Sequence, residues 1–293
     1  MTIGQALRQA TATLESHHIS EAHLEAEVLL MHALTLSRAQ LYSHLEREMP
    51  PDEAQDFANF VKLRIRGEPV AYIIGHKEFF GHDFQVDRRV LIPRPETELL
   101  VEKALEFAKG RVSSLEDMPL IIADIGTGCG AIAISLALEL PGAKIYGTDI
   151  SHEALEVAKA NCTKHGVDLQ VRLLWGDMLD PLPEPIHFIV ANLPYVEDAE
   201  LEQLPPEIRE FEPRIALAGG ADGLDNIRRL LMEAKGKLRP RGAILMEIDP
   251  RQSQDVMELA ESCFPTSEVH VARDLRGLDR VITLETQSAQ SQN

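Results

Sequence analysis

Residues 1–68 alternate apolar and polar positions at the spacing of α-helices. Apolar side chains recur on one helical face between Ile3 and Leu14, and the stretch EAHLEAEVLLMHALT supplies a second apolar face. Ser37 is placed to cap a third helix, and the Pro-Pro-Asp run at 50–52 can restart a fourth. Residues 1–68 therefore predict a small helical bundle. We interpret it as a docking domain, because it has no catalytic constellation of titratable residues.

The pattern changes over residues 69–95. Short β-like runs occur there, with Gly75 and Gly81 at positions suited to turns. A new helical pattern starts near Pro95. We interpret 69–95 as a hairpin linker that leads into the main domain.

Beyond residue 118, predicted strands and helices alternate. The apolar runs LIIADIG, AKIYGTDI, LQVRLLWGDM, IHFIVANLP and GAILMEID predict strands, with helical patterns between most of them. Such alternation predicts an α/β domain with a parallel sheet covered by helices on both faces. The last two runs, SEVHVARD and DRVITLE, are separated only by LRGL, which favours an antiparallel ending. The domain is predicted over 96–285, followed by a polar tail at 286–293.

Composition narrows the classes of partner. The 293 residues carry a formal net charge of −18, which opposes binding to bare nucleic acid. Three cysteines without metal-ligand spacing favour a reducing, cytoplasmic compartment and no metal site. No basic region followed by an apolar core begins the chain, and no apolar run reaches the roughly 18 residues of a membrane span. We therefore expect no signal peptide and no membrane partner.

The stretch ADIGTGCGAIAIS resembles a ligand-binding loop between a strand and a helix. Asp124 ends the strand, and Gly126, Gly128 and Gly130 permit positive φ and close approach of a ligand to the backbone. The helix that follows offers free N–H groups to an anionic part of the ligand. Asp149 comes at the end of the next strand, where a carboxylate can accept hydrogen bonds from two ribose hydroxyls.

This loop alone fits two kinds of cofactor. Gly126, Gly128 and Ala131 satisfy the loose dinucleotide fingerprint, so a nicotinamide-dependent dehydrogenase is a competing interpretation. Asp177 follows the third strand, where it can accept from an adenine amino group while Met178 covers the ring. Acidic residues after three successive strands, with an aromatic tetrad after the fourth, favour an S-adenosylmethionine domain. Nothing after the fourth strand supplies the acid or base of a hydride-transfer site.

The fourth strand of this domain ends on Asn192, Leu193, Pro194 and Tyr195. Ligands of doubly wound sheets bind outside the carboxyl ends of the strands, so this tetrad is expected beside the transferable methyl. A conjugated amino group is a poor nucleophile that must be held and aimed. The Asn192 side-chain oxygen and the Leu193 carbonyl can accept its two N–H groups, Pro194 stiffens the turn, and Tyr195 can stack on the planar group. The tetrad therefore predicts a grip for a planar amino or amide nitrogen, with the rate coming from orientation.

Several stretches together resemble the protein-(glutamine-N5) methyltransferases that act on peptide chain release factors. They are RGEPVAYIIGHKEFFGHDFQVDRRVLIPRPETE, DIGTGCGAIAISLA, TDISHEALEVAKAN, ANLPYV, EPRIALAGGADGLD and DLRGLDRV, and they cover nearly the whole chain. The resemblance implies a helical domain that docks the release factor, followed by a Rossmann-like seven-stranded catalytic domain. It implies methyl transfer from S-adenosyl-L-methionine to the glutamine of a Gly-Gly-Gln loop, with S-adenosylhomocysteine as product.

The resemblance assigns roles residue by residue. The cofactor would be held by Asp124, Gly126, Thr127, Gly128, Cys129, Gly130, Asp149, Asp177, Met178 and Asn192. The substrate would be held by Arg94, Asn192, Leu193, Pro194 and Tyr195, of which Asn192, Pro194 and Tyr195 serve catalysis. Pro95 and Thr97 would shape the pocket beside Arg94, and Glu212 with Pro213 would support it.

One departure leaves alternatives open. The family usually has proline where this chain has Leu193. The sequence NLPY is also found at this motif in ribosomal-RNA adenine dimethyltransferases. Adenine amino methylation of RNA or DNA, glutamine methylation of a ribosomal protein, and a binding module without activity therefore stay open. The expected partner is a release factor, with no direct nucleic acid contact, and the expected oligomeric state is a monomer.

Overall fold

The computed structural model describes residues 1–112 and 119–287, which fall into two compact units. The helical unit comprises residues 1–76 together with 205–211, and the sheet unit comprises 77–204 together with the chain from 212 onward. The sequence division at residue 68 did not anticipate the contribution of 205–211. From residue 288 on, the polar tail predicted at 286–293 lies outside the described residues.

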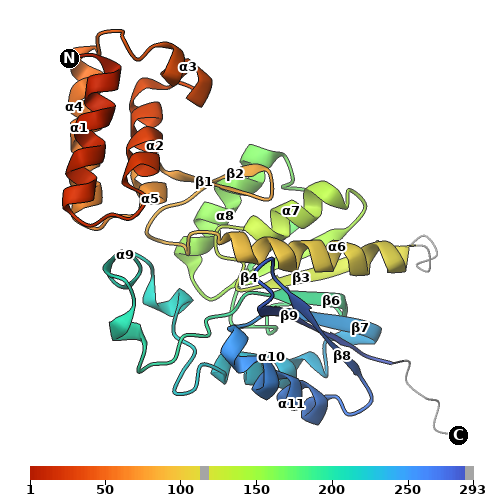
Figure 1. The fold of residues 1–293 in the computed structure, drawn as a ribbon. Coiled ribbons are helices and arrows are strands. Elements are labelled where there is room, and N and C mark those ends of the chain that lie inside the picture. Colours follow the sequence, from red (N-terminus) through yellow and green to blue (C-terminus); the bar gives the residue numbers. More distant parts are fainter. Residues whose placement is uncertain (113–118, 288–293) are drawn as a thin grey trace, which may run out of the picture. The chain divides into compact units, whose positions relative to one another are not determined.

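The helical unit is built from amphipathic helices that share one apolar core (Figure 1). The helices of this core are α1 (Ile3–Ser16), α2 (Ala22–Leu34), α3 (Arg38–Ser43), α4 (Pro51–Ile65) and α5 (Val70–Ile74). The short α9 (Pro206–Arg209) belongs to the same unit but has no buried residue. The predicted cap at Ser37 is confirmed: its hydroxyl accepts from the Gln40 backbone N–H, and the Gln40 side chain accepts from the Ser37 N–H in return. Thr2 and Gln5 form the same reciprocal cap at the start of α1.

Helix α5 corrects the prediction of β-like structure at the start of the linker. Val70 and Ile74 bound a helix, not a strand, and both side chains pack with Ile73 against the core of the helical unit. Pro69 precedes the helix in extended conformation, where its missing N–H costs nothing. Burial of this apolar face outweighs the β-preference of the branched residues.

Segment 205–211 is fastened to the helical unit by the buried Arg64. The Arg64 Nε donates to a Glu25 carboxylate oxygen at 2.6 Å, and its Nη2 donates to Glu207 at 2.7 Å. A Cβ on Gly67 would lie 3.5 Å from the Phe211 ring. One buried guanidinium thus joins α2, α4 and a segment more than a hundred positions later in the chain.

The sheet unit contains a seven-stranded sheet in the order β5-β4-β3-β6-β7-β9-β8. Its strands are β3 (Ile121–Ile125), β4 (Lys144–Asp149), β5 (Val171–Trp175), β6 (Ile186–Ala191), β7 (Leu238–Glu247), β8 (Glu268–Arg273) and β9 (Asp279–Glu285). The pairs among β3 to β7 are parallel, and β9 runs antiparallel to both neighbours, as the short LRGL connection predicted. The predicted Rossmann-like fold class is confirmed.

Helices cover both faces of this sheet, with α6, α7 and α8 on one side and α10 and α11 on the other (Figure 1). Their bounds are α6 (Glu98–Val112), α7 (Ala131–Glu139), α8 (His152–His165), α10 (Asp225–Ala234) and α11 (Ser253–Cys263). The hairpin β1 (His76–Phe79) and β2 (His82–Gln85) precedes them. The 3-10 turns are η1 (Pro95–Thr97), η2 (Leu201–Gln203), η3 (Arg214–Ala216) and η4 (Pro250–Gln252). None of the helices in residues 1–112 and 119–287 has the length and apolar character needed to cross a membrane.

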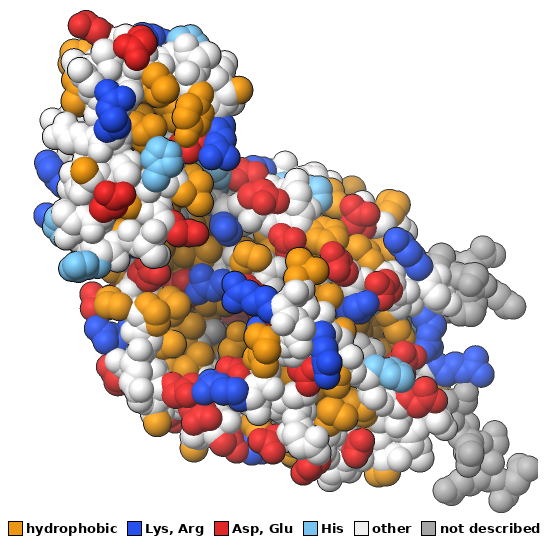
Figure 2. Space-filling model, viewed as in Figure 1, with side chains coloured by type: hydrophobic (Ala, Val, Ile, Leu, Met, Phe, Trp, Pro, Cys, Tyr) orange, Lys and Arg blue, Asp and Glu red, His pale blue; other side chains and the backbone are white. Residues whose placement is uncertain are grey.

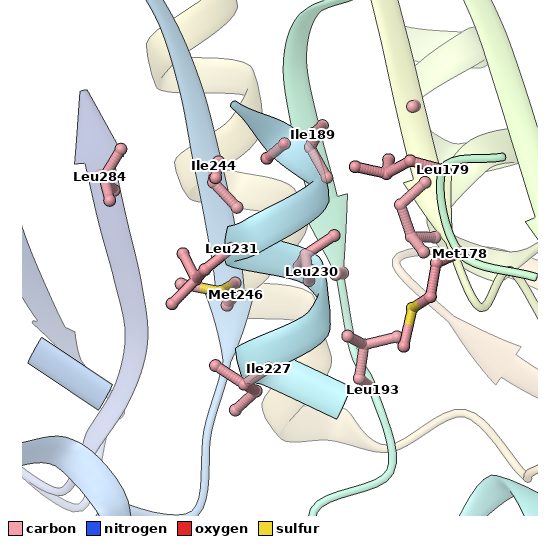
Figure 3. Packing of buried hydrophobic residues seen from close by; sticks show 14 of the residues in the cluster. Met178, Leu179, Ile189, Leu193, Ile227, Leu230, Leu231, Ile244, Met246 and Leu284 are labelled. Carbon is pink, nitrogen blue, oxygen red and sulfur yellow. The ribbon is translucent and has the colours of Figure 1, made fainter. Parts of the chain in front are cut away.

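The core beneath α10 reaches the end of β6. Ile227, Leu230 and Leu231 of α10 pack over the apolar side chains of the central strands (Figure 3). Leu193, just beyond the end of β6, belongs to the same cluster and lies beside Met178 (Figure 3). The turn that follows β6 is therefore anchored in the core by an apolar side chain.

Candidate active site

A cavity of about 260 Å³ lies at the carboxyl ends of β3, β4, β5 and β6. The sheet order reverses at β3, whose neighbours are β4 on one side and β6 on the other, and ligands of such sheets bind at this switch point. Predicted site residues that line the cavity are Gly126, Gly128, Asp149, Asp177, Met178, Asn192, Leu193, Pro194 and Pro213. Topology thus brings together segments that lie far apart in the sequence.

The glycine loop after β3 is held in left-handed conformations. Gly126, Gly128 and Gly130 have φ values of +71°, +56° and +84°, which residues with a Cβ rarely adopt. The backbone N–H of Gly126 donates to the Thr148 carbonyl at 2.9 Å. A Cβ on Gly130 would lie 3.0 Å from Ile134, so this position is also closed sterically. The loop is therefore a preformed cradle.

Asp124 supports this loop from behind the cavity. Its side chain is fully buried and accepts from the Thr127 hydroxyl at 2.6 Å and the Ala133 N–H at 3.1 Å. Burial raises the pKa of Asp124 to about 7, against the opposing effect of these hydrogen bonds. Asp124 does not line the cavity, and neither do Thr127 and Cys129, which are both buried. Their position is that of residues that shape the loop.

Asp149 links the loop to the end of β4. One carboxylate oxygen accepts from the Gly128 N–H and the other from the Ser151 N–H, both at 2.9 Å. Burial raises the pKa of this carboxyl, and the backbone hydrogen bonds act in the opposite direction. Because Asp149 lines the cavity, its remaining lone pairs can face a ligand. Ser151 caps α8 as the sequence predicted.

Asp177 and Met178 line the cavity after β5, but Asp177 has a partner that the sequence did not indicate. The Arg229 guanidinium of α10 donates to the Asp177 carboxylate at 2.7 Å, and both side chains are partly exposed. Met178 has a φ of +46°, and its carbonyl accepts from the Thr148 hydroxyl at 3.0 Å. The carboxylate predicted to meet an adenine amino group is therefore shared with an arginine.

Several polar groups of the tetrad after β6 are held by hydrogen bonds to residues of other segments. The Asn192 side-chain nitrogen donates to the Thr97 hydroxyl at 3.0 Å, which leaves its oxygen free to face the cavity. The Pro194 carbonyl accepts from Asn226 at 2.9 Å, and the Tyr195 carbonyl accepts from Gln252 at 3.1 Å. Within the part of the chain that the structure describes, no hydrogen bond ends on the backbone carbonyl of Leu193. Two consecutive residues of the tetrad thus each keep one acceptor that takes no hydrogen bond from the described residues.

Leu193 explains how the tetrad tolerates the absence of the usual proline. Its side chain is buried and packs in the core beside Met178. A Cβ on Gly126 would lie 3.3 Å from the end of the Leu193 side chain, so the glycine loop and the tetrad are in close contact. Anchoring by Leu193 restricts the turn by packing where a proline would restrict it covalently.

Tyr195 and Arg94 lie outside the residues that line the cavity. Burial raises the pKa of the Tyr195 phenol, and the nearby charge of Glu247 adds to the rise. Arg94 donates to both oxygens of the buried Glu212 carboxylate at 2.6 Å. This ion pair joins the turn before α6 to the loop that follows residue 211.

The structure adds residues that sequence reasoning missed. Arg89, Val90 and Leu91 line the cavity, and they belong to the stretch RRVLIPRPETE, whose resemblance to the family was the signal for them. Asn161 of α8 donates to the Cys129 carbonyl at 2.9 Å and to the Gln85 carbonyl at 3.0 Å. No pattern in the sequence indicated that the amides of Asn161 and Asn226 would hold the loop and the tetrad.

Comparison with known proteins decides the family. The description "PrmC N-terminal domain" matches residues 5–75, and "Methyltransferase small domain" matches residues 112–205. A release factor glutamine methyltransferase of Moorella thermoacetica is 45% identical over 281 residues, covering 96% of this chain and 97% of the relative. The chain belongs to the release factor glutamine methyltransferase family. A second member, from Chlorobaculum tepidum, is 38% identical over 291 residues and 98% of both chains.

A solved structure agrees with the fold of this family member. The crystal structure of a methyltransferase from Pyrococcus furiosus has a TM-score of 0.52 at 17% identity, covering 78% of this chain and 99% of that one. At this identity the likeness concerns the fold alone. The family and its fold imply S-adenosylmethionine as the methyl donor. Among residues 1–112 and 119–287, no cluster of three or more His, Cys, Asp or Glu side chains could hold a metal ion.

Proposed function

We propose that this enzyme transfers a methyl group from S-adenosylmethionine to the side-chain amide nitrogen of the glutamine in the Gly-Gly-Gln motif of peptide chain release factors. The observation that carries the proposal is that two consecutive cavity-lining residues each keep an acceptor without a hydrogen bond among the described residues, the Asn192 side-chain oxygen and the Leu193 carbonyl. A primary amide has two N–H groups in one plane, and two acceptors on consecutive residues can receive them.

The cavity suits the proposed cofactor by the groups that surround it. The left-handed cradle from Gly126 to Gly130 admits a ligand close to the backbone, and Asp149 offers lone pairs for ribose hydroxyls. Asp177 and Met178 would flank the adenine, with Asp177 held in place by Arg229. When bound, S-adenosylmethionine supplies an electrophilic methyl group. Asp124, Thr127 and Cys129, assigned to the cofactor from the sequence, would act by shaping the loop.

The residues of the tetrad would do the remaining work by orientation. Binding both N–H groups of the amide leaves the nitrogen lone pair aimed out of the amide plane, toward the cavity. Transfer makes the nitrogen cationic and its proton strongly acidic, so no strong general base is required. Pro194 and the anchored Leu193 would keep the grip rigid, and Tyr195, which does not line the cavity, would support the turn through its carbonyl bond to Gln252. Holding reactants in attack geometry contributes about 7–11 kcal/mol in favourable cases.

We infer that the helical unit docks the release factor and that the enzyme acts as a cytoplasmic monomer, without membrane or direct nucleic acid contact. Figure 2 shows acidic and basic side chains intermingled over most of the visible face. This distribution agrees with the net charge of −18 and favours a protein substrate over a nucleic acid.

A transfer assay with labelled S-adenosylmethionine tests the proposal. Purified release factor, ribosomal protein and ribosomal RNA are offered side by side, and the modified residue is located by mass spectrometry. We expect label on the motif glutamine, none on a release factor with that glutamine changed to alanine, and none with Asn192→Ala. Label on RNA or on a ribosomal protein alone would contradict the proposed substrate.

A further inference from the structure

The side-chain amide of Asn192 can work in only one of its two orientations. With its oxygen toward the cavity it accepts a substrate N–H, whereas the flipped amide would set its own N–H groups against those of the substrate. A half-turn of the amide leaves the shape of the side chain almost unchanged, so packing alone does not choose between the orientations. Some hydrogen-bonding partner has to fix the direction.

Thr97 is that partner. Its hydroxyl receives the Asn192 Nδ2–H at 3.0 Å, and Thr97 is 4% exposed at the end of the turn η1. A threonine hydroxyl can also donate, however, and a donating Thr97 would attract the Asn192 oxygen instead. The direction of the bond therefore depends on where the single hydroxyl proton of Thr97 points.

Glu247, the last residue of β7, determines the position of that proton. It is 2% exposed, and its carboxylate lies near enough to the Thr97 side chain for that hydroxyl to lower the pKa of Glu247. An ionised carboxylate only accepts, so a Thr97 hydroxyl whose proton points at Glu247 has only lone pairs left for Asn192. Among the described residues, Oε2 of Glu247 is buried without a hydrogen-bond partner, so an acceptor is open to that proton. Such a buried carboxylate is costly and is not explained by stability.

We propose that Thr97 and Glu247 are positioning residues that hold the Asn192 amide with its oxygen toward the substrate nitrogen. This inference rests on the proposed function of Asn192 as an acceptor of the substrate amide. The Glu247 carboxylate has no proton to give, so it attracts the proton of the Thr97 hydroxyl. The Thr97 oxygen can then only accept from Asn192, which sets the orientation of the Asn192 amide.

This positioning of the Asn192 amide requires ionised Glu247. Burial raises the pKa of Glu247 to about 7, and the nearby Thr97 hydroxyl and the charge of Arg280 oppose the rise. A protonated Glu247 could donate to Thr97, which would then be free to donate to Asn192. The charged and titratable groups that face Glu247 or the adjacent phenol are Arg280, Arg94, Glu96, Asp249 and Tyr195.

Two substitutions at Thr97 separate positioning from packing. Thr97→Val keeps the shape and removes the hydroxyl, whereas Thr97→Ser keeps the hydroxyl and removes a methyl. We expect Thr97→Val to lower kcat about 10- to 100-fold with an unchanged Kd for S-adenosylmethionine. Thr97→Ser should stay within about threefold of the parent, since a small cavity affects stability more than orientation. Parent-like transfer by Thr97→Val, or equal damage in both variants, would overturn the inference.

The pH profile at saturating substrate gives a second readout. We expect the parent kcat to rise with pH through about 7, as Glu247 ionises, and the rise to disappear in Glu247→Gln. The other groups that face this site are unchanged in that variant, so a rise caused by them would persist. An unchanged pH profile in Glu247→Gln would contradict the role of Glu247.

A substrate-free measurement separates this inference from the proposed function. In the full chain, the Asn192 side-chain NH₂ resonance, assigned by its loss in Asn192→Ala, should exchange slowly with solvent. It should exchange faster in Thr97→Val and remain slow in Thr97→Ser. Failure of the parent to methylate release factor would contradict the proposed function. An exchange rate unaffected by Thr97→Val would overturn only the inferred positioning of Asn192 by Thr97 and Glu247.

Discussion

Arg94 and Glu212, which are 118 residues apart in the chain, form an ion pair in which one guanidinium nitrogen lies 2.6 Å from each carboxylate oxygen. The glutamate side chain is 1% exposed and the arginine side chain 31%. Both residues were assigned to the site only by resemblance, and neither lines the cavity. Their role in this structure is to fasten two loops to each other beside the tetrad.

Removal of Arg94 should therefore act first on stability. Arg94→Ala takes the arginine from a buried carboxylate, and we expect the free energy of unfolding to fall by about 3 kcal/mol. Arg214→Ala is the matched control, because its pair with Glu202 is 67% and 74% exposed and contributes less than about 1 kcal/mol. Urea denaturation measures both. Equal effects in the two variants would show that burial of Glu212 adds nothing to the pair.

Substitutions of Asp149 and Asn192 should affect different steps, the first the binding of S-adenosylmethionine and the second methyl transfer. Asp149→Ala removes the acceptor of two backbone N–H groups that shape the cradle, as well as the proposed ribose contact. Hydrogen bonds to a charged group contribute about 1.5–3 kcal/mol, so we expect Kd for S-adenosylmethionine to rise about 100-fold. Asn192→Ala should change this Kd less than about threefold and lose transfer. Calorimetric titration of both variants checks the contrast, and a similar loss of affinity in both would contradict it.

The fold could be predicted from periodicity because each element is locally consistent. The apolar runs LIIADIG, AKIYGTDI and IHFIVANLP contain the strands β3, β4 and β6, and Ser37 and Ser151 are caps as predicted. Helix α5 could not be predicted, because it is too short for a helical period to appear. Its conformation is decided by packing against helices that the local sequence does not specify.

The site could be predicted only as far as strand topology carries it. Residues that follow parallel strands meet at one edge of the sheet, which is why Asp149, Asp177 and Asn192 could be expected to lie together. The partners of these residues were not predictable. Arg229 reaches Asp177 across 52 residues and Gln252 reaches the Tyr195 carbonyl across 57, and such contacts depend on how helices pack. Segment 205–211 joined the helical unit for the same reason.

Asp124 gives the protein a pH-dependent stability. Its pKa rises from an ordinary value of 3.8 to about 7 in the folded protein, so the folded state keeps a proton that the unfolded chain has lost. This contribution is fully present below about pH 4 and is lost as pH rises through 7, at about 1 kcal/mol per pH unit in between. Asp124→Asn should flatten the slope between pH 5 and 7. Denaturation curves at each pH give the free energy of unfolding of both proteins. Equal slopes of this free energy against pH in variant and parent would contradict the raised pKa of Asp124.

The absence of a side chain at Gly223 leaves room for the hydrogen bond from the Gln252 side chain to the Tyr195 carbonyl. Gly223 has a φ of +73°, and an added Cβ would lie 2.3 Å from both the Gln252 side-chain nitrogen and the Tyr195 carbonyl oxygen. Gly223→Ala therefore breaks that hydrogen bond, and we expect a loss of about 3 kcal/mol in stability together with slower transfer. Gly277→Ala is the control, because Gly277 has a φ of +78° but no described atom within 4 Å of its Cβ position, and strain alone costs about 1 kcal/mol. Thermal unfolding and the transfer assay compare them. If the two variants lost the same stability, backbone strain and not the Tyr195 contact would account for Gly223.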